Sequence, residues 1–174
     1  MKTRKFFTIF CCVLLAVILL TALSLPQGKR DGQVTFYYPA EEYSYGSPQG
    51  VMGSEAREVG SHQTDLTYLL DLYLQGPISQ NLAQAFPSSA ITKVQSVKMA
   101  GSSLVITLSD LDSAMSEGQF SLACACLTKT CLGFTNARAV QIHSGERSVR
   151  MTPSNLVLFD ESTSVIQPGG EEEK

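Results

Sequence analysis

The chain has 174 residues, of which 44% are hydrophobic and 17% charged, and its formal net charge is −3. Beyond the first 25 residues, ten basic and sixteen acidic residues remain, which gives about 150 residues with a net charge of −6. That length fits one ordinary domain, and the acidic balance argues against nucleic-acid binding, which needs a basic face.

Residues 1–25 are typical of an export or anchoring signal. Lys2, Arg4 and Lys5 precede an apolar run from Phe6 to Leu25. A bilayer core of ~30 Å needs about 20 helical residues at ~1.5 Å each, and this run reaches that length. We therefore predict a single transmembrane helix with a cytoplasmic N-terminus and an extracytoplasmic domain behind it.

Two other membrane signals compete with this anchor. Ala22 and Ser24 are small residues that suit a cleavage site, so a cleaved and secreted product is the alternative. Cys11 and Cys12 lie inside the apolar run, too early for the cysteine of a lipid-attachment signal.

The first part of the exported chain predicts a linker and two strands. Residues 26–32 are polar and rich in glycine and charge, which is typical of a short linker. Residues 33–38 alternate between apolar and polar side chains and predict a strand that ends at Pro39. Residues 40–53 predict a loop, and residues 55–59 a second short strand.

An amphipathic helix follows. Thr64 or Asp65 is expected to cap it, and Gly76-Pro77 to end it. Its apolar stripe has helical spacing and comprises Leu66, Leu69, Leu70, Tyr73 and Leu74. Residues 81–86 predict a further helical turn.

The remaining segments predict a hairpin, a second helix and short strands. The expected elements are strands at 91–99 and 104–109, a polar loop at 110–118, a buried helix at 119–132, a strand at 139–142 that turns at 144–146, and an apolar segment at 156–159. The domain is expected to span residues 33–160. Residues 161–174 predict a disordered acidic tail.

The order β-(β)-α-β-β-α-β defines the predicted fold class. It is an α+β domain with two helices on one face of a small, mostly antiparallel sheet.

The segment Leu66–Pro77 resembles the helix and Gly-Pro signature of the GerM-like (GerMN) domain family. The segments that follow it agree in order, and the likeness covers residues 33–152. They are a stretch that ends at Phe86-Pro87, strands at Lys93–Met99 and Leu104–Ser109, and a helix followed by the strand Ala139–His143.

This resemblance implies a fold, a location and a role. Such domains are similar to the ring-building domains of the sporulation channel and lie outside the membrane of Gram-positive, often spore-forming bacteria. They act as assembly or interaction modules in sporulation or germination, and the resemblance brings no catalytic residue with it.

Three cysteines in the second predicted helix were considered as a metal or redox site. Side chains two residues apart on a helix point ~200° apart, so Cys124 and Cys126 cannot chelate one ion. Cys124 and Cys131 share a face but lie ~10.5 Å apart along the axis, too far for a disulfide. We expect all three to be core residues, with a redox-sensitive thiol as the weaker alternative.

The two histidines offer no recognisable catalytic spacing. A triad of His62 with Asp65, or of His143 with Ser144, is conceivable, but solvated surface histidines are the expectation. Neither a phosphate-binding loop nor a nucleophile elbow occurs in the sequence, so we predict no catalytic, cofactor-binding or metal-binding residues and no enzyme activity.

Two surface segments were also considered for binding. The acidic segment with Asp110, Asp112 and Glu117 lacks the spacing of an EF-hand, and a loop with a helix cap is expected. Ordinary packing is the expectation for the tyrosines at positions 37, 38, 43 and 45, and a contact or glycan-stacking surface is the alternative.

These observations predict a membrane-anchored interaction or assembly module of the bacterial envelope. Its partners are the membrane, through the N-terminal helix, and other envelope proteins or further copies of itself. The alternative is a peptidoglycan- or glycan-binding protein that uses the tyrosine-rich loop.

Overall fold

The computed structural model describes residues 32–42, 50–156, 158–160 and 163–166. The predicted transmembrane segment and almost all of the linker lie outside these ranges. Within them, no helix combines the length and the apolar character needed to cross a bilayer.

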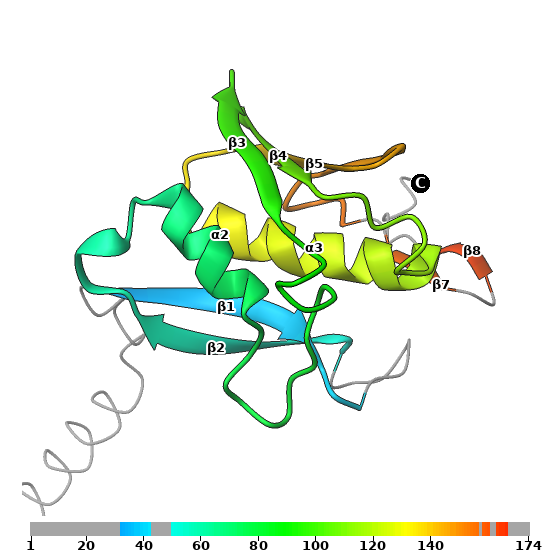
Figure 1. Cartoon of the computed structure of the whole chain (residues 1–174), viewed down its shortest axis with the longest axis horizontal. Coiled ribbons are helices and arrows are strands. Elements are labelled where there is room, and N and C mark those ends of the chain that lie inside the picture. The colour runs from blue at the N-terminus through cyan, green and yellow to red at the C-terminus, as the bar shows by residue number, and fades with distance from the viewer. Residues whose placement is uncertain (1–31, 43–49, 157, 161–162, 167–174) are drawn as a thin grey trace, which may run out of the picture. The chain divides into compact units, whose positions relative to one another are not determined.

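An antiparallel hairpin forms the first layer of the domain (Figure 1). It consists of β1, Gln33–Pro39, and β2, Met52–Glu58, with Phe36 opposite Glu55. The alternation predicted for β1 is confirmed, because Val34, Phe36 and Tyr38 are buried. β2 begins inside the segment that we predicted as loop.

Two helices form the middle layer. After a short 3-10 turn, η1, at Gly60–His62, comes α2, Leu66–Leu74, whose first turn is capped by Asp65. The second helix is α3, Glu117–Phe134, which begins with a reciprocal capping box between Ser116 and Gln119. Both helices were predicted, although α3 is longer than expected.

A four-stranded sheet forms the third layer. Its strands, in spatial order, are β3, Val94–Ala100; β4, Ser103–Leu108; β5, Ala139–Ser144; and β6, Arg147–Met151. β3–β4 and β5–β6 are antiparallel hairpins, whereas β4 and β5 pair in parallel. The parallel pair follows from the crossover through α3, since parallel neighbours need a long connection.

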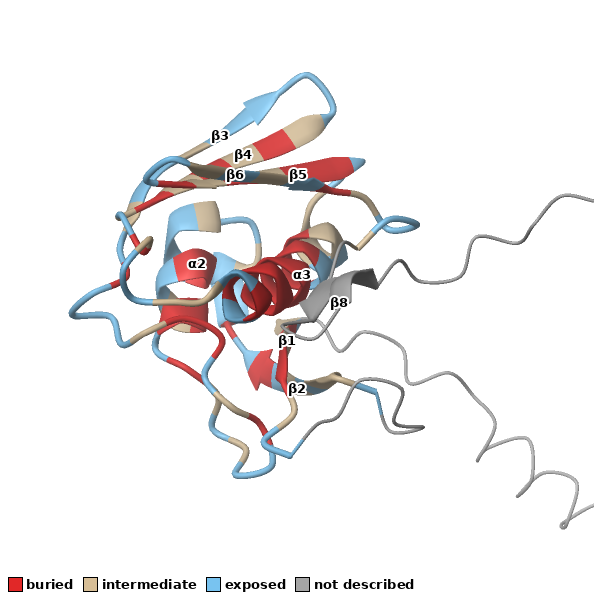
Figure 2. Ribbon diagram, turned by 90° about the vertical axis from the view of Figure 1, so that its right-hand side faces the viewer, coloured by how far each residue is buried: buried red, intermediate tan, exposed pale blue. Residues whose placement is uncertain are grey.

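The layering corrects one part of the predicted fold. The α+β class with two helices is observed, but the strands form separate sheets, and the helices lie between the hairpin and the four-stranded sheet (Figure 2). The reason lies in α3, where every residue from Phe120 to Thr128 is buried. A helix that is apolar around its circumference needs cover on more than one side.

Two further segments differ from the prediction. Residues 81–86 form no helical turn, and Leu82 instead makes an isolated antiparallel bridge with Ala40. Near the C-terminus, β7, Leu158–Asp160, pairs with β8, Thr163–Ile166, so a short strand lies within the segment predicted as a tail.

The core joins all three layers. Tyr73 on α2 stacks on Tyr38 on β1, with ring centroids 4.7 Å apart, and meets the edge of Phe86 at 6.4 Å. On the other side, Leu104 and Ile106 of β4 are fully buried against the helices.

Candidate interaction surface

The best-defined polar constellation lies where β2 meets the end of α2. Glu55 and Arg57 are two residues apart on β2 and therefore share a face. The Arg57 Nε donates to Glu55 Oε1 at 2.7 Å, and the side chains of Arg57 and Glu55 are only 7% and 11% exposed. This is a nearly buried ion pair.

Both partners are tied to the chain that follows α2. Glu55 Oε2 accepts the backbone N–H groups of Ile78 at 3.1 Å and Ser79 at 2.9 Å. Arg57 donates to the carbonyls of Leu72 and Gly76. Gly76 has a φ of +89°, a left-handed conformation that glycine adopts without strain. The ion pair thus holds the turn after α2 against β2.

Hydrogen bonding sets the charge state of Glu55. Burial alone would raise its pKa, but the N–H groups of Ser79 and Ile78 and the Arg57 guanidinium stabilise the carboxylate. Together they outweigh burial and hold the pKa of Glu55 below its ordinary value. The Glu55–Arg57 pair, which we call the clamp, is therefore ionised at neutral pH.

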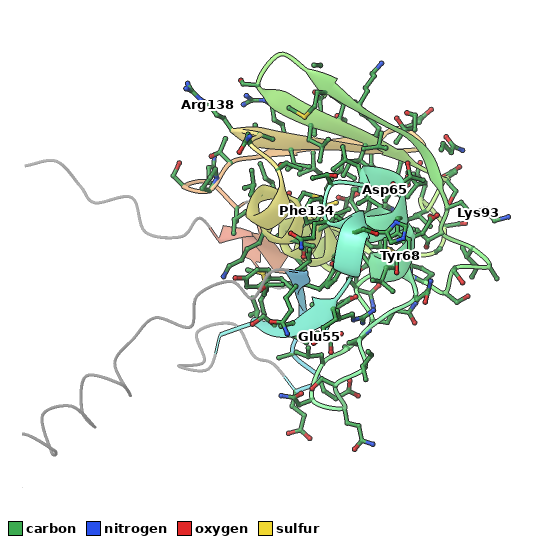
Figure 3. All side chains as sticks on the ribbon, turned by 90° about the vertical axis from the view of Figure 1, so that its left-hand side faces the viewer. Glu55, Asp65, Tyr68, Lys93, Phe134 and Arg138 are labelled. Atoms are coloured by element: carbon green, nitrogen blue, oxygen red, sulfur yellow. The ribbon has the colours of Figure 1, made fainter. Side chains whose placement is uncertain are left out.

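This clamp borders an open groove, which we call the Tyr68 groove. It has a volume of about 490 Å³, and its lining includes Ala56, Glu58, Tyr68, Leu72, Pro77 and Ile78. Figure 3 shows Glu55 on β2 below Tyr68 on α2. Tyr68 is 38% exposed and Ile78 is 78% exposed, so the groove presents large apolar side chains to solvent.

His62 belongs to the edge of this surface. Its ring stacks on Tyr68 with centroids 4.3 Å apart, and its Nδ1 lies 3.8 Å from Asp65 Oδ2. The side chain is about half exposed, as expected for a surface histidine. The contact with Asp65 joins two exposed groups and brings no nucleophile with it.

The other histidine does not assemble with its neighbouring serine. His143 and Ser144 are consecutive on β5, so their side chains point to opposite faces of the sheet. Ser144 is buried, donates its hydroxyl to the carbonyl of Ser109 at 2.7 Å and accepts the N–H of Leu111 at 3.0 Å. Its hydroxyl is therefore engaged in fixing the loop after β4.

The prediction for the cysteines as core residues is confirmed. Cys124, Cys126 and Cys131 are free thiols without solvent exposure, and burial raises the pKa of each. Across the described part of the chain, no three histidine, cysteine or acidic side chains are grouped to hold a metal ion.

The side chain of Arg147 lies at the centre of the acidic loop, although no sequence motif pointed to this residue. The Arg147 Nε lies 3.2 Å from Asp112 Oδ1 and 3.4 Å from Glu117 Oε1, and its guanidinium lies over the Phe120 ring. Asp110 accepts the N–H of Asp112 at 2.9 Å. The loop-and-cap interpretation is confirmed, with Arg147 as its centre.

The two tyrosines of this group that the structure describes pack against other side chains, as expected. Tyr38 is buried, and Tyr37 is partly covered by Lys129, whose Nζ lies 4.5 Å from the ring centroid. Tyr43 and Tyr45 lie outside the described residues. Among the described residues, Tyr68 is the exposed large aromatic side chain, and its position off the apolar stripe of the helix was the sequence signal for this exposure.

Comparisons with known proteins add little to this geometry. No family model matches the chain, and no curated protein matches it. One similar solved structure is an inferred lipoprotein from Clostridium perfringens, with 21% identity and a TM-score of 0.40. The match covers 80% of this chain and 87% of that one. Such a likeness is too weak to assign a family, and the GerM-like resemblance remains a prediction.

Proposed function

We propose that this chain is a membrane-anchored extracytoplasmic interaction module of the bacterial envelope that binds a partner protein at the Tyr68 groove. The basic residues and the apolar run at the N-terminus support the location. The observation that carries the contact is a rigidly held and largely exposed Ile78 beside Tyr68.

The physical argument rests on exposed apolar area and preorganisation. Complete burial of an isoleucine side chain is worth about 1.5–3 kcal/mol, and aromatic residues are enriched at interfaces. Because Glu55 holds the N–H groups of Ile78 and Ser79, little backbone freedom remains to be lost on binding. A partner that inserts an apolar side chain into the groove gains both effects.

The proposed role involves no catalytic step. The proposal of a role in sporulation or germination rests on the GerM-like resemblance. The partner protein at the groove includes the case of a second copy of this chain. Glycan binding by the tyrosine-rich loop stays a prediction, because Tyr43 and Tyr45 lie outside the described residues.

Photo-crosslinking in cells tests the proposed contact. A photoreactive residue replaces Ile78 in the full chain, and the matched control replaces Ile91, another exposed isoleucine outside the groove, which is 52% exposed. We expect an adduct of defined mass from position 78 that disappears on Tyr68→Ala, and none from position 91. Equal adducts from both positions, or none from position 78, contradict the proposal.

A further inference from the structure

The outer face of the four-stranded sheet carries a row of side chains that includes two cations. The pairing register places Lys98 beside Val105, Val105 beside Gln141, and Gln141 beside Arg150. Leu104 and Ile106 on β4 are fully buried, so Val105 between them points to the outside. Lys98 and Arg150 are exposed and three strand spacings apart, roughly 14 Å.

Hydroxyl and imidazole groups form the next row on the same face. The register aligns Ser96, Thr107, His143 and Ser148 across the four strands. The Ser96 hydroxyl lies 3.0 Å from that of Thr107. These groups add hydrogen-bonding capacity beside the cations.

A third cation borders this surface. Arg138 is exposed at the entrance to β5, where its backbone N–H donates to the carbonyl of Ser102 at 2.7 Å, and Figure 3 shows it at the side of the sheet. We call the surface defined by Lys98, Gln141, His143 and Arg150, with Arg138 at its edge, the cationic sheet face.

This face is free of acidic residues although the exported part has a net charge of −6. Residues 93–109, 135–145 and 147–157 contain no aspartate or glutamate. In the described ranges, Lys98, Arg138 and Arg150 have no carboxylate within ion-pair distance, whereas Arg57 and Arg147 are both paired. The unpaired cations are thus available to an external anion.

The chain enters the domain far from this face. Gly32 leads into β1, and its carbonyl accepts the N–H of Val59 at 2.7 Å, which places the entry in the hairpin layer. The hairpin and the four-stranded sheet lie on opposite sides of α3 (Figure 2).

We propose that the cationic sheet face binds a linear phosphodiester polymer of the cell wall, an inference that rests on the envelope location proposed above. Such a polymer carries an anion in every repeat and can meet several separated cations at once. The planar guanidinium groups of Arg138 and Arg150 suit phosphate oxygens, and Gln141 adds a donor between Lys98 and Arg150. The separation of Lys98 from Arg150 across the four strands favours an extended polymer with a regularly repeated charge.

A sedimentation assay with the full chain in detergent tests this assignment. The probes are purified Gram-positive wall fragments, either intact or stripped of phosphodiester polymer with hydrofluoric acid. We expect binding to intact fragments that weakens as salt rises from 50 to 300 mM, as for other exposed ionic contacts. Replacing Lys98, Arg138 and Arg150 together by serine is expected to weaken binding about 10- to 100-fold, at two- to fivefold per cation.

The controls separate this inference from its alternatives. Lys93→Ser removes an exposed cation outside the face and is expected to leave binding unchanged. Equal binding to stripped fragments, or equal loss with Lys93→Ser, overturns the proposal. Binding to vesicles of anionic lipid with the same variant dependence overturns it in favour of a membrane surface.

A groove variant distinguishes the two proposals. Tyr68→Ala is expected to keep wall binding intact while it removes the adduct formed from position 78. A chain with Tyr68 intact that forms the adduct but does not bind the wall overturns only the polymer site. A chain with Tyr68 intact that binds the wall but forms no adduct from position 78 overturns only the protein contact.

Discussion

At the scale of single residues, the Glu55–Arg57 pair explains why the groove is rigid. The sequence predicted a short strand at this point but not a buried ion pair, because sequence spacing carries no information on the carbonyls of Leu72 and Gly76 that surround Arg57. The cysteines were easier to predict, since neither a metal site nor a disulfide fits their helical spacing. Sequence patterns do not predict such contacts between segments that lie far apart in the chain.

Glu55→Gln tests the pair. The substitution leaves the Arg57 charge buried without its partner, so we expect a loss of about 3 kcal/mol in the free energy of unfolding at pH 7. Chemical denaturation of the full chain in detergent measures this. Glu58→Gln, an exposed change on the same strand, is expected to stay within about 0.5 kcal/mol of wild type, and an equal loss at both positions contradicts the account.

The same pair gives a pH dependence with a defined sign. The pKa of Glu55 is lower in the folded than in the unfolded state, so its stabilisation is fully present above the ordinary glutamate value of about 4.3. That stabilisation disappears as the pH falls through the folded pKa. The difference between wild type and Glu55→Gln should therefore shrink at pH values below about 4.

At the scale of elements, periodicity predicted the helices and the β3–β4 hairpin but not the layering of the elements. The apolar stripe of α2 and the alternation of β4 each identify one buried face, and both were confirmed. α3 lacks a dominant polar face, and this was the signal that it needed cover on two sides. The pairing of β1 was harder to predict, because its partner is β2 and the Met52–Glu58 sequence of β2 contains few residues that favour strands.

The β5–β6 turn shows how an element can depend on one glycine. Gly145 has a φ of +55°, and an added Cβ would lie 2.5 Å from Asp110 Oδ1 and 2.7 Å from Asp112 Oδ2. These carboxylates have little freedom to move, because Asp112 pairs with Arg147 and Asp110 accepts the N–H of Asp112.

Gly145→Ala is therefore expected to destabilise the domain more than Gly101→Ala. Gly101 also has a positive φ, +61°, but an added Cβ there meets nothing within 4 Å. The left-handed backbone alone costs about 1–2 kcal/mol, and the collision at Gly145 should add at least about 1 kcal/mol. Thermal unfolding of the two variants compares them directly, and equal losses would show that the carboxylates yield freely.

At the scale of the whole molecule, the two proposed binding surfaces, one cationic and one apolar, lie in different layers of the domain. The Tyr68 groove lies between the hairpin and α2, whereas the cationic sheet face lies on the far side of the four-stranded sheet. The sequence predicted a surface-based role from its lack of catalytic motifs, but it did not locate either surface. Both depend on the register and on residues brought together from distant parts of the chain.

Labelling in intact cells tests most directly whether the domain works outside the cytoplasmic membrane. Ser89→Cys, made in a parent chain in which Cys11 and Cys12 are replaced by alanine, places a thiol in an exposed loop. Cys124, Cys126 and Cys131 are buried and are therefore not labelled. With a membrane-impermeant maleimide, we predict that intact cells producing this variant are labelled at residue 89 and that the parent chain is not. Labelling of residue 89 only after the cells are lysed would contradict the account.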